Sequence, residues 1–326
     1  MKNPISWCDC TWNPVSGCSK VSAGCTHCWA ERMAKRLAGR GGYPAEHPFA
    51  VTLHPERLDE PLHWRKPRMV FVCSMGDLFH PEVPDEFIAS VWNRMYQASK
   101  CTFQVLTKRP ERMQEWLSRC GNGGGYGWIT HDNTPPARAF DGTGIILGLS
   151  DNWPLPNVWL GTSVEDRAAA DERIPHLLRC PAAVRFVSYE PALGPLDLQY
   201  AAFNGADSIE GLEGLGWVIA GGETGPGSRP AHPDWFRSVR DQCAHAGVPF
   251  FFKQWGEWLT AHVEDDPGYY GGRAFNNPRG GRASGAIENY RYRLLNPDTI
   301  AVRVGKKAAG HLLDGREHRE FPKARA

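Results

Sequence analysis

The chain has 326 residues, with 37 Lys and Arg against 36 Asp and Glu, and therefore a formal net charge of +1. This balance provides no overall field that would attract DNA or anionic lipid, so any nucleic-acid contact must be local. The 41% hydrophobic content suits a globular protein, and ten cysteines are too few for a disulfide scaffold. Without a long apolar run or an apolar signal-peptide core, the sequence predicts a cytoplasmic protein that does not enter a membrane.

Short apolar runs alternate with amphipathic helical stretches along the chain. The expected strands are 11–15 (the weakest), 49–54, 69–74, 102–107, 157–163, 184–190, 216–223 and 248–254. The expected helices are 29–38, 84–100, 110–119, 168–178 and 233–246. Pro84 and Pro233 mark two of the helix starts, because each precedes an acidic residue of the first turn. Nearly continuous apolar strands indicate burial on both faces, as in a parallel sheet covered by helices.

This alternation predicts an α/β fold that is TIM-barrel-like, a partial or complete parallel β/α barrel over residues 1–260. No Gly-x-Gly-x-x-Gly motif follows the first strand, which disfavours an open dinucleotide-binding sheet. Residues 121–156 are rich in Gly, Pro and Asn, and are predicted to form an insertion or a lid. Residues 261–326 are expected to pack on the barrel as an extension, with a small hairpin and a short helix closing one mouth.

Three cysteines near the N-terminus are the clearest chemical signal. Cys18, Cys25 and Cys28 are separated by six and then two residues, with no nearby fourth cysteine downstream. A structural zinc site needs four protein ligands, whereas an iron–sulfur cube held by three thiolates leaves one iron open for a substrate or cosubstrate. A zinc site made of Cys8, Cys10, Cys25 and Cys28 is the alternative, although thiols at alternate strand positions converge poorly with a loop pair. Burial as small hydrophobic residues is expected for Cys73, Cys101, Cys120, Cys180 and Cys243.

Polar side chains follow most of the predicted strands. In a parallel barrel the site lies at the carboxyl ends of the strands, and the cysteine loop follows the first strand to the same mouth. A single polar residue there often caps the next helix or faces water, but a set of them indicates a site. We expect one cavity, within reach of the cysteine loop, to be lined by Ser74, Asp77, Lys108, Ser163, Glu190 and Glu223.

Several segments carry a resemblance to known proteins: TWNPVSGC, CTHCWAERMAKRL, TLHPERLDEPLHWRKPR, LTKRPERM, VWLGTSVED, RFVSYEPALGP, GGETGPGSRP and FFKQWGEW. Over nearly its whole length, apart from 121–156, the chain resembles phage and prophage proteins of mostly unassigned function. That family in turn resembles the radical S-adenosylmethionine (SAM) enzymes. The resemblance implies a TIM-type barrel with a [4Fe-4S] cluster on Cys18, Cys25 and Cys28. Their commonest loop has three residues between its first two cysteines and an aromatic before the third, whereas this chain has six residues and His27.

The resemblance also implies a reaction. SAM would bind the open iron and be cleaved to a 5′-deoxyadenosyl radical, with electrons from a reductant such as flavodoxin or ferredoxin. SAM needs a carboxylate for its ammonium, a cation or hydroxyl for its carboxylate, and an apolar shelf for its adenine. The candidates are Asp77, Glu190 or Glu223 for the ammonium, Lys108 or Arg109 for the carboxylate, the hydroxyls of Ser74 and Ser163, and His27, Trp29 or Phe79 for the adenine. A modified thymine nucleotide or DNA base of a phage is the expected substrate, in the cytoplasm of a bacterial host.

Other functions stay open on the sequence. An isomerase, a lyase or a transferase would each suit the radical chemistry. The alternatives are a zinc-stabilised barrel hydrolase or binding protein, and a nucleic-acid-binding protein with a structural metal site. Four aromatic residues near the tail could stack on bases, although packing is the commoner role of such residues: Trp255, Trp258, Tyr269 and Tyr270. Arg32, Lys35 and Arg36 are expected to face solvent.

Overall fold

The computed structural model describes residues 5–121, 154–203, 212–262, 275–276, 282–283, 292–296 and 299–323. Apart from its two ends, the predicted insertion at 121–156 lies outside these residues, as do Tyr269, Tyr270 and the side chain of Cys120. Within the ranges that are described, no helix is both long and apolar enough to cross a membrane.

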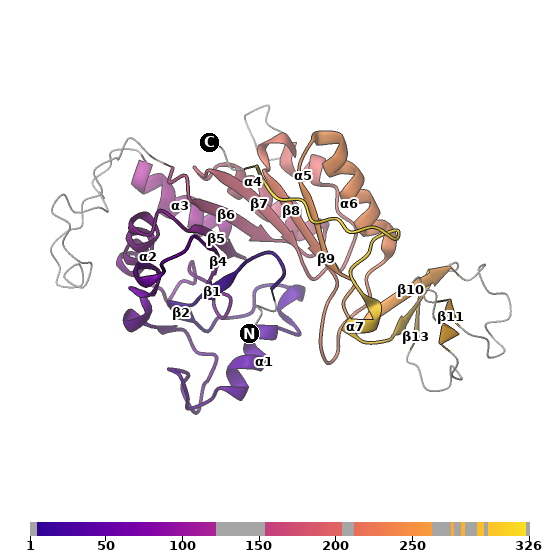
Figure 1. Cartoon of the computed structure of the whole chain (residues 1–326), viewed down its shortest axis with the longest axis horizontal. Helices are drawn as coiled ribbons and strands as arrows, with labels where there is room; N and C mark the ends of the chain where they lie inside the picture. Colours follow the sequence, from indigo (N-terminus) through magenta and orange to yellow (C-terminus); the bar gives the residue numbers. More distant parts are fainter. Residues whose placement is uncertain are drawn as a thin grey trace.

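Seven parallel strands form one curled sheet with the order β1-β4-β5-β6-β7-β8-β9. The strands are β1 (Cys10–Trp12), β4 (Met69–Val72), β5 (Thr102–Thr107), β6 (Val158–Ser163), β7 (Val184–Tyr189), β8 (Trp217–Gly221) and β9 (Phe250–Gln254). Spatial order follows chain order, as it does in a β/α barrel. Because β1 and β9 are the two edges, the sheet is a half-barrel (Figure 1). The prediction of a barrel-like α/β fold is confirmed at this level.

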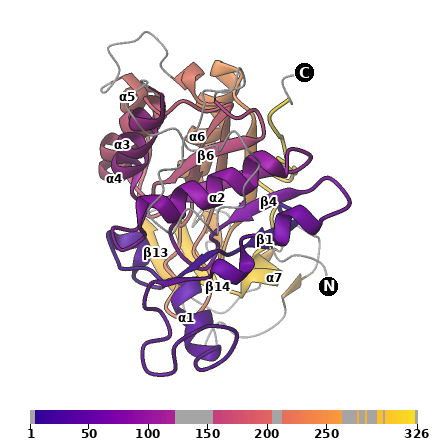
Figure 2. The same cartoon turned by 90° about the vertical axis from the view of Figure 1, so that its left-hand side faces the viewer.

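Helices cover the outer face of the sheet (Figures 1 and 2). They are α2 (Asp85–Gln97), α3 (Pro110–Gly121), α4 (Arg167–Leu178), α5 (Leu198–Phe203) and α6 (Pro233–Ala246). The predicted starts of α2 and α6 are confirmed, with Pro84 and Pro233 at the first turns. The remaining long helix, α1 (Trp29–Arg36), lies on the other side of the sheet, next to the cysteine loop.

Side chains alternate between the two faces of the sheet, and both faces carry apolar clusters. The strands are therefore nearly continuous apolar runs in the sequence. Val158 and Leu160 of β6 join the large core under the helices, whereas Trp159 belongs to a second cluster on the concave face. In that second cluster Trp217 lies 6.2 Å from Trp7 and 6.0 Å from Trp159, measured between ring centroids. These aromatic residues fill one part of the concave face with side chains.

The predicted strand 49–54 is not part of the main sheet. Only β3 (Thr52–Leu53) forms there, and it pairs antiparallel with β2 (Val15–Ser16). The predicted strand 11–15 is likewise divided between β1 and β2, because Pro14 between them has no amide hydrogen to donate to a ladder. The small β2–β3 ribbon therefore replaces a full strand–helix unit between β1 and β4, and the cysteine loop leaves from it.

The C-terminal extension begins a little earlier than predicted, within β10 (Trp258–His262). β10 pairs with β14 (Thr299–Arg303), which pairs with β13 (Tyr292–Asn296), and the predicted short helix is α7 (Lys306–Ala309). β11 (Phe275–Asn276) and β12 (Arg282–Ala283) form a separate two-stranded sheet.

The last described residues run back along the outer edge of β9. Phe252 N donates to His318 O at 2.8 Å, and Glu320 N donates to Phe250 O at 3.2 Å. Asp314 fixes the same segment to α6 through Arg237 and Arg240, at 2.8 and 2.6 Å. This segment thus pairs with the edge that a closed barrel would pair with its first strand.

Candidate functional site

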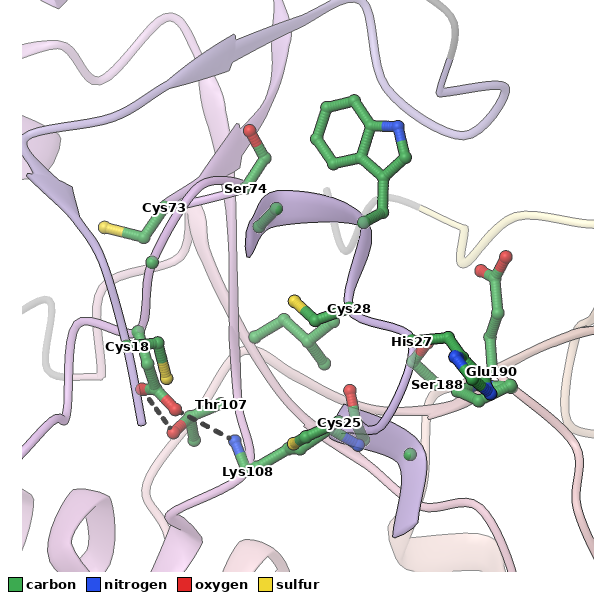
Figure 3. A pocket seen from close by; sticks show the side chains of 18 of the residues that line it. Cys18, Cys25, His27, Cys28, Cys73, Ser74, Thr107, Lys108, Ser188 and Glu190 are labelled. Carbon is green, nitrogen blue, oxygen red and sulfur yellow. Dashed lines mark hydrogen bonds between the residues drawn. The ribbon is translucent and has the colours of Figure 1, made fainter. Parts of the chain in front are cut away.

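A cavity of about 350 Å³ lies at the carboxyl ends of the strands. Eleven of the site residues predicted from the sequence line it: Cys18, Cys25, His27, Cys28, Trp29, Ser74, Asp77, Lys108, Ser163, Glu190 and Glu223. Figure 3 labels ten of the lining residues. The predicted gathering of the strand ends around one cavity is therefore confirmed, as parallel strands require.

The three cysteines lie on the loop between β2 and α1. The loop leaves the ribbon at Gly17, which has a φ of +83°. A Cβ at this position would lie 2.0 Å from Ala50 O, so only glycine fits between the ribbon and the loop. Cys18 N then donates to Phe49 O at 3.2 Å, and the loop passes through a short 3-10 turn at Ala23–Cys25 before α1 begins. The ribbon thus directs the thiols to the cavity.

The sulfur atoms of Cys18, Cys25 and Cys28 surround one space in Figure 3. Among the residues that the structure describes, no three His, Cys, Asp or Glu side chains converge closely enough to hold a single metal ion. Thiolates on one zinc ion lie within about 4 Å of each other, because each Zn–S bond is about 2.3 Å. A four-iron cube carries its cysteines on different irons and needs a wider arrangement. The three thiols of this loop are of the ligand type and number that a [4Fe-4S] cluster with one open iron takes.

The other N-terminal cysteines do not join this group. Cys8 and Cys10 precede or begin β1, at the opposite end of the strand from the loop, and neither lines the cavity. Cys73 does line it but is only 3% exposed, and burial raises the pKa of its thiol to about 12. The proposed zinc ligands Cys8 and Cys10 thus lie apart from Cys25 and Cys28.

Arg109 connects the cysteine loop to the ends of β4 and β5. Its Nη1 donates to Cys18 Sγ at 3.4 Å and to Asp77 Oδ2 at 2.9 Å, and its Nη2 donates to Ser19 O at 3.1 Å. Asp77 also accepts from Thr107 Oγ1 at 2.7 Å and from Phe79 N at 3.0 Å. Burial, together with the Asp77 charge, raises the pKa of Cys18 to about 11, and Arg109 opposes this shift.

A second connection passes through Glu165, which is 1% exposed. Its carboxylate accepts from Lys108 Nζ at 3.0 Å, from Arg173 Nη1 at 3.2 Å and from Gly24 N at 3.4 Å. A Cβ at Gly24 would lie 3.1 Å from Lys108 Nζ, so glycine allows the loop to approach this pair closely. Lys108 is held against the backbone between Cys18 and Cys25 as a result.

Glu223 provides the third connection. It accepts from Arg229 Nε at 2.8 Å, from Arg229 Nη2 at 2.6 Å and from Arg229 N at 2.7 Å. The same guanidinium donates to Ala23 O at 3.0 Å, within the cysteine loop. Bidentate pairs of this kind fix geometry strongly. Asp77, Glu165 and Glu223 therefore all help to hold the loop in place.

Glu190 is placed differently. Both of its oxygens accept from Lys253 Nζ at 2.8 Å, and Gln254 Nε2 lies 3.4 Å from Oε1. Both Glu190 and Lys253 line the cavity. Among the described residues this pair forms no hydrogen bond with the cysteine loop, and it is directly available to a ligand in the cavity.

Some parts of the site had no clear signal in the sequence. The apolar lining comes from Ile5, Trp7, Phe71 and Leu106. Only Leu106 and Phe71 could have been found, because they occupy alternate positions of predicted strands. Phe79 was expected near the adenine, but it is fully buried in the core and does not line the cavity.

Other expectations can be compared with the structure directly. The packing role that the sequence favoured for Trp255 and Trp258 is confirmed, because both are buried and their indole nitrogens donate to Leu312 O and Ser228 O. Lys35 and Arg36 are exposed as predicted, whereas Arg32 Nη2 donates to Thr224 O. Burial is confirmed for Cys73, Cys101, Cys180 and Cys243.

Comparison with known proteins gives one result. The chain matches a family described as "Protein of unknown function (DUF5131)" over residues 2–322. No curated protein and no solved structure matches it. Because the match spans nearly all of the chain, this protein belongs to the DUF5131 family.

Proposed function

We propose that this protein is a radical SAM enzyme in which Cys18, Cys25 and Cys28 hold a [4Fe-4S] cluster. The observation that carries the proposal is that three thiols of one loop line a cavity at the carboxyl ends of a β/α half-barrel. Thiolates are the ligands of such clusters, and three of them leave one iron for a cosubstrate. When bound, the group supplies one-electron reduction of the SAM sulfonium, the chemistry that yields a 5′-deoxyadenosyl radical. The electron would come from an external donor such as flavodoxin or ferredoxin.

The chain's own residues would bind and orient SAM. Lys108, fixed beside the loop by Glu165, is the proposed partner of the SAM carboxylate. Glu190 is the proposed partner of its ammonium, because the oxygens of Asp77 and Glu223 already accept from several donors of the chain. Ser74, Ser163, His27 and Trp29 remain proposed contacts of the same cosubstrate, and the apolar lining can shelter its adenine.

The cavity suits a small molecule. Ligand sites commonly enclose about 300–1,000 Å³, with an apolar lining and a few fixed polar groups. The proposed substrate is a modified thymine nucleotide or DNA base, on the strength of the phage resemblance. The arrangement supports an enzyme more than a nucleic-acid-binding module, because thiols, carboxylates and cations line one cavity together.

Anaerobic reconstitution followed by metal analysis tests the proposal against the zinc alternative. We expect about four irons and four sulfides per chain, with broad absorption near about 400 nm. Stoichiometric zinc, with no iron retained after desalting, would support the zinc-stabilised protein instead. Purification from cells grown with added iron and with added zinc gives the matched comparison.

A further inference from the structure

We propose that the end of the cavity formed by β8, β9 and α7 binds an anionic group of the substrate through Lys306. A phosphate of a nucleotide and a carboxylate of a modified base share this chemistry. The inference rests on the proposed function only in taking this cavity as the place where the substrate reacts. It adds a residue from the C-terminal extension to the site.

The two ends of the cavity are separate. Cys18 and Thr107 lie on one side of Figure 3, and Glu190 and Ser188 lie on the other. Neighbouring strands are about 4.8 Å apart, and β6, β7 and β8 stand between β5 and β9. SAM reaching from Lys108 to Glu190 would therefore leave the part of the cavity beyond Glu190, toward β9 and α7, for the substrate.

The cations at this second end differ in their partners. Lys253 neutralises Glu190, and Arg229 neutralises Glu223. Lys306 also lines the cavity, but it forms no ion pair with any residue that the structure describes. By contrast, the cavity cations Lys108 and Arg109 both have carboxylate partners. Lys306 is thus an exposed cation of the cavity whose charge is not neutralised by an ion pair with a described carboxylate.

Free hydroxyl groups point to a polar ligand at the same end. Ser188 is only 3% exposed and lines the cavity, yet its hydroxyl forms no hydrogen bond within the described part of the chain. Thr224, which follows β8, is also a lining residue whose hydroxyl has no partner among the described residues. Both hydroxyls therefore remain available to donate to a ligand in the cavity. An ammonium and hydroxyl donors together suit an anion.

Pairs of anionic and neutral ligands test this proposal and show whether the bound anion is a phosphate or a carboxylate. Calorimetry on the reconstituted protein would compare thymidine 5′-monophosphate with thymidine for a phosphate, and orotate with uracil for a carboxylate. We expect at least one anion to bind about tenfold more tightly than its neutral counterpart. Lys306→Gln should remove that difference, whereas Lys307→Gln should retain it, because both lysines are exposed but only Lys306 lines the cavity.

A wild-type protein that binds neither anion more tightly than its neutral counterpart would overturn the proposal. A preference that survives in Lys306→Gln, or is lost equally in Lys307→Gln, would overturn it too. Iron content is measured on the same samples. Absence of iron speaks against the cluster, whereas the binding difference reports on Lys306, so the two failures are distinguishable.

Discussion

Replacing Cys18, Cys25 or Cys28 singly with Ala is expected to reduce the iron retained after anaerobic reconstitution from about four per chain to nearly none. All three thiols belong to one loop that is fixed to the strands by Arg109, Glu165 and Arg229. One iron of the cube is already open, so the loss of one thiolate leaves two of the four irons without a protein ligand, and no single variant should retain the cluster. Iron and acid-labile sulfide assays after desalting measure the result.

Cys73→Ala is the matched control. Cys73 lines the same cavity, but its side chain is only 3% exposed and packs into the large core under the helices, so it is not available as a cluster ligand. Its variant should retain full iron, as should Cys243→Ala in the core under the helices. Full iron content in Cys25→Ala would refute the assignment of the loop as the cluster site.

Glu165→Gln should have the largest effect on stability, lowering the free energy of unfolding of the apo protein by about 3 kcal/mol. The substitution leaves Lys108 and the nearly buried Arg173 without their shared carboxylate. Asp241→Asn is the control. The Asp241 side chain is solvent-exposed, so its ion pair with Arg240 should contribute less than about 1 kcal/mol to the free energy of unfolding. Anaerobic urea denaturation measures both, and equal effects of the two substitutions would contradict the network.

Protonation of the Glu165 carboxylate should make the free energy of unfolding depend on pH. Burial raises the pKa of Glu165, but Lys108, Ser22 and Arg173 outweigh burial and leave it below the ordinary value of 4.5. A carboxyl with a depressed pKa in the folded state stabilises the protein above its unfolded-state pKa, and that contribution is lost as pH falls through the folded-state value. The difference in stability between wild type and Glu165→Gln should therefore be full near neutral pH and shrink only below about pH 4.5.

The sequence predicted most of what local chemistry decides. Strands such as 102–107 and 184–190 were recognisable from their composition, and the rule that parallel strands end at one edge correctly placed Asp77, Lys108 and Glu190 around one cavity. The prediction of a main-sheet strand at 49–54 was wrong. This short apolar run pairs with the residues that follow Pro14 and forms the small ribbon, outside the main sheet.

The remaining features of the site depend on contacts between residues that are far apart in the sequence. No local pattern could show that Trp7 would lie on the concave face or that Lys306 would reach the cavity from the extension. The sequence also could not distinguish the carboxylates that hold the loop from the one that faces the cavity. That distinction depends on where the guanidinium groups of Arg109 and Arg229 fold back onto the loop.

The most direct test of a radical SAM function is the formation of 5′-deoxyadenosine. Reconstituted wild-type protein, given SAM and a low-potential reductant, should release it slowly without substrate and faster with the right one, as followed by chromatography of quenched anaerobic mixtures. Cys28→Ala treated in the same way should release none. A wild-type protein with a complete, reducible cluster that forms no 5′-deoxyadenosine would contradict the assignment.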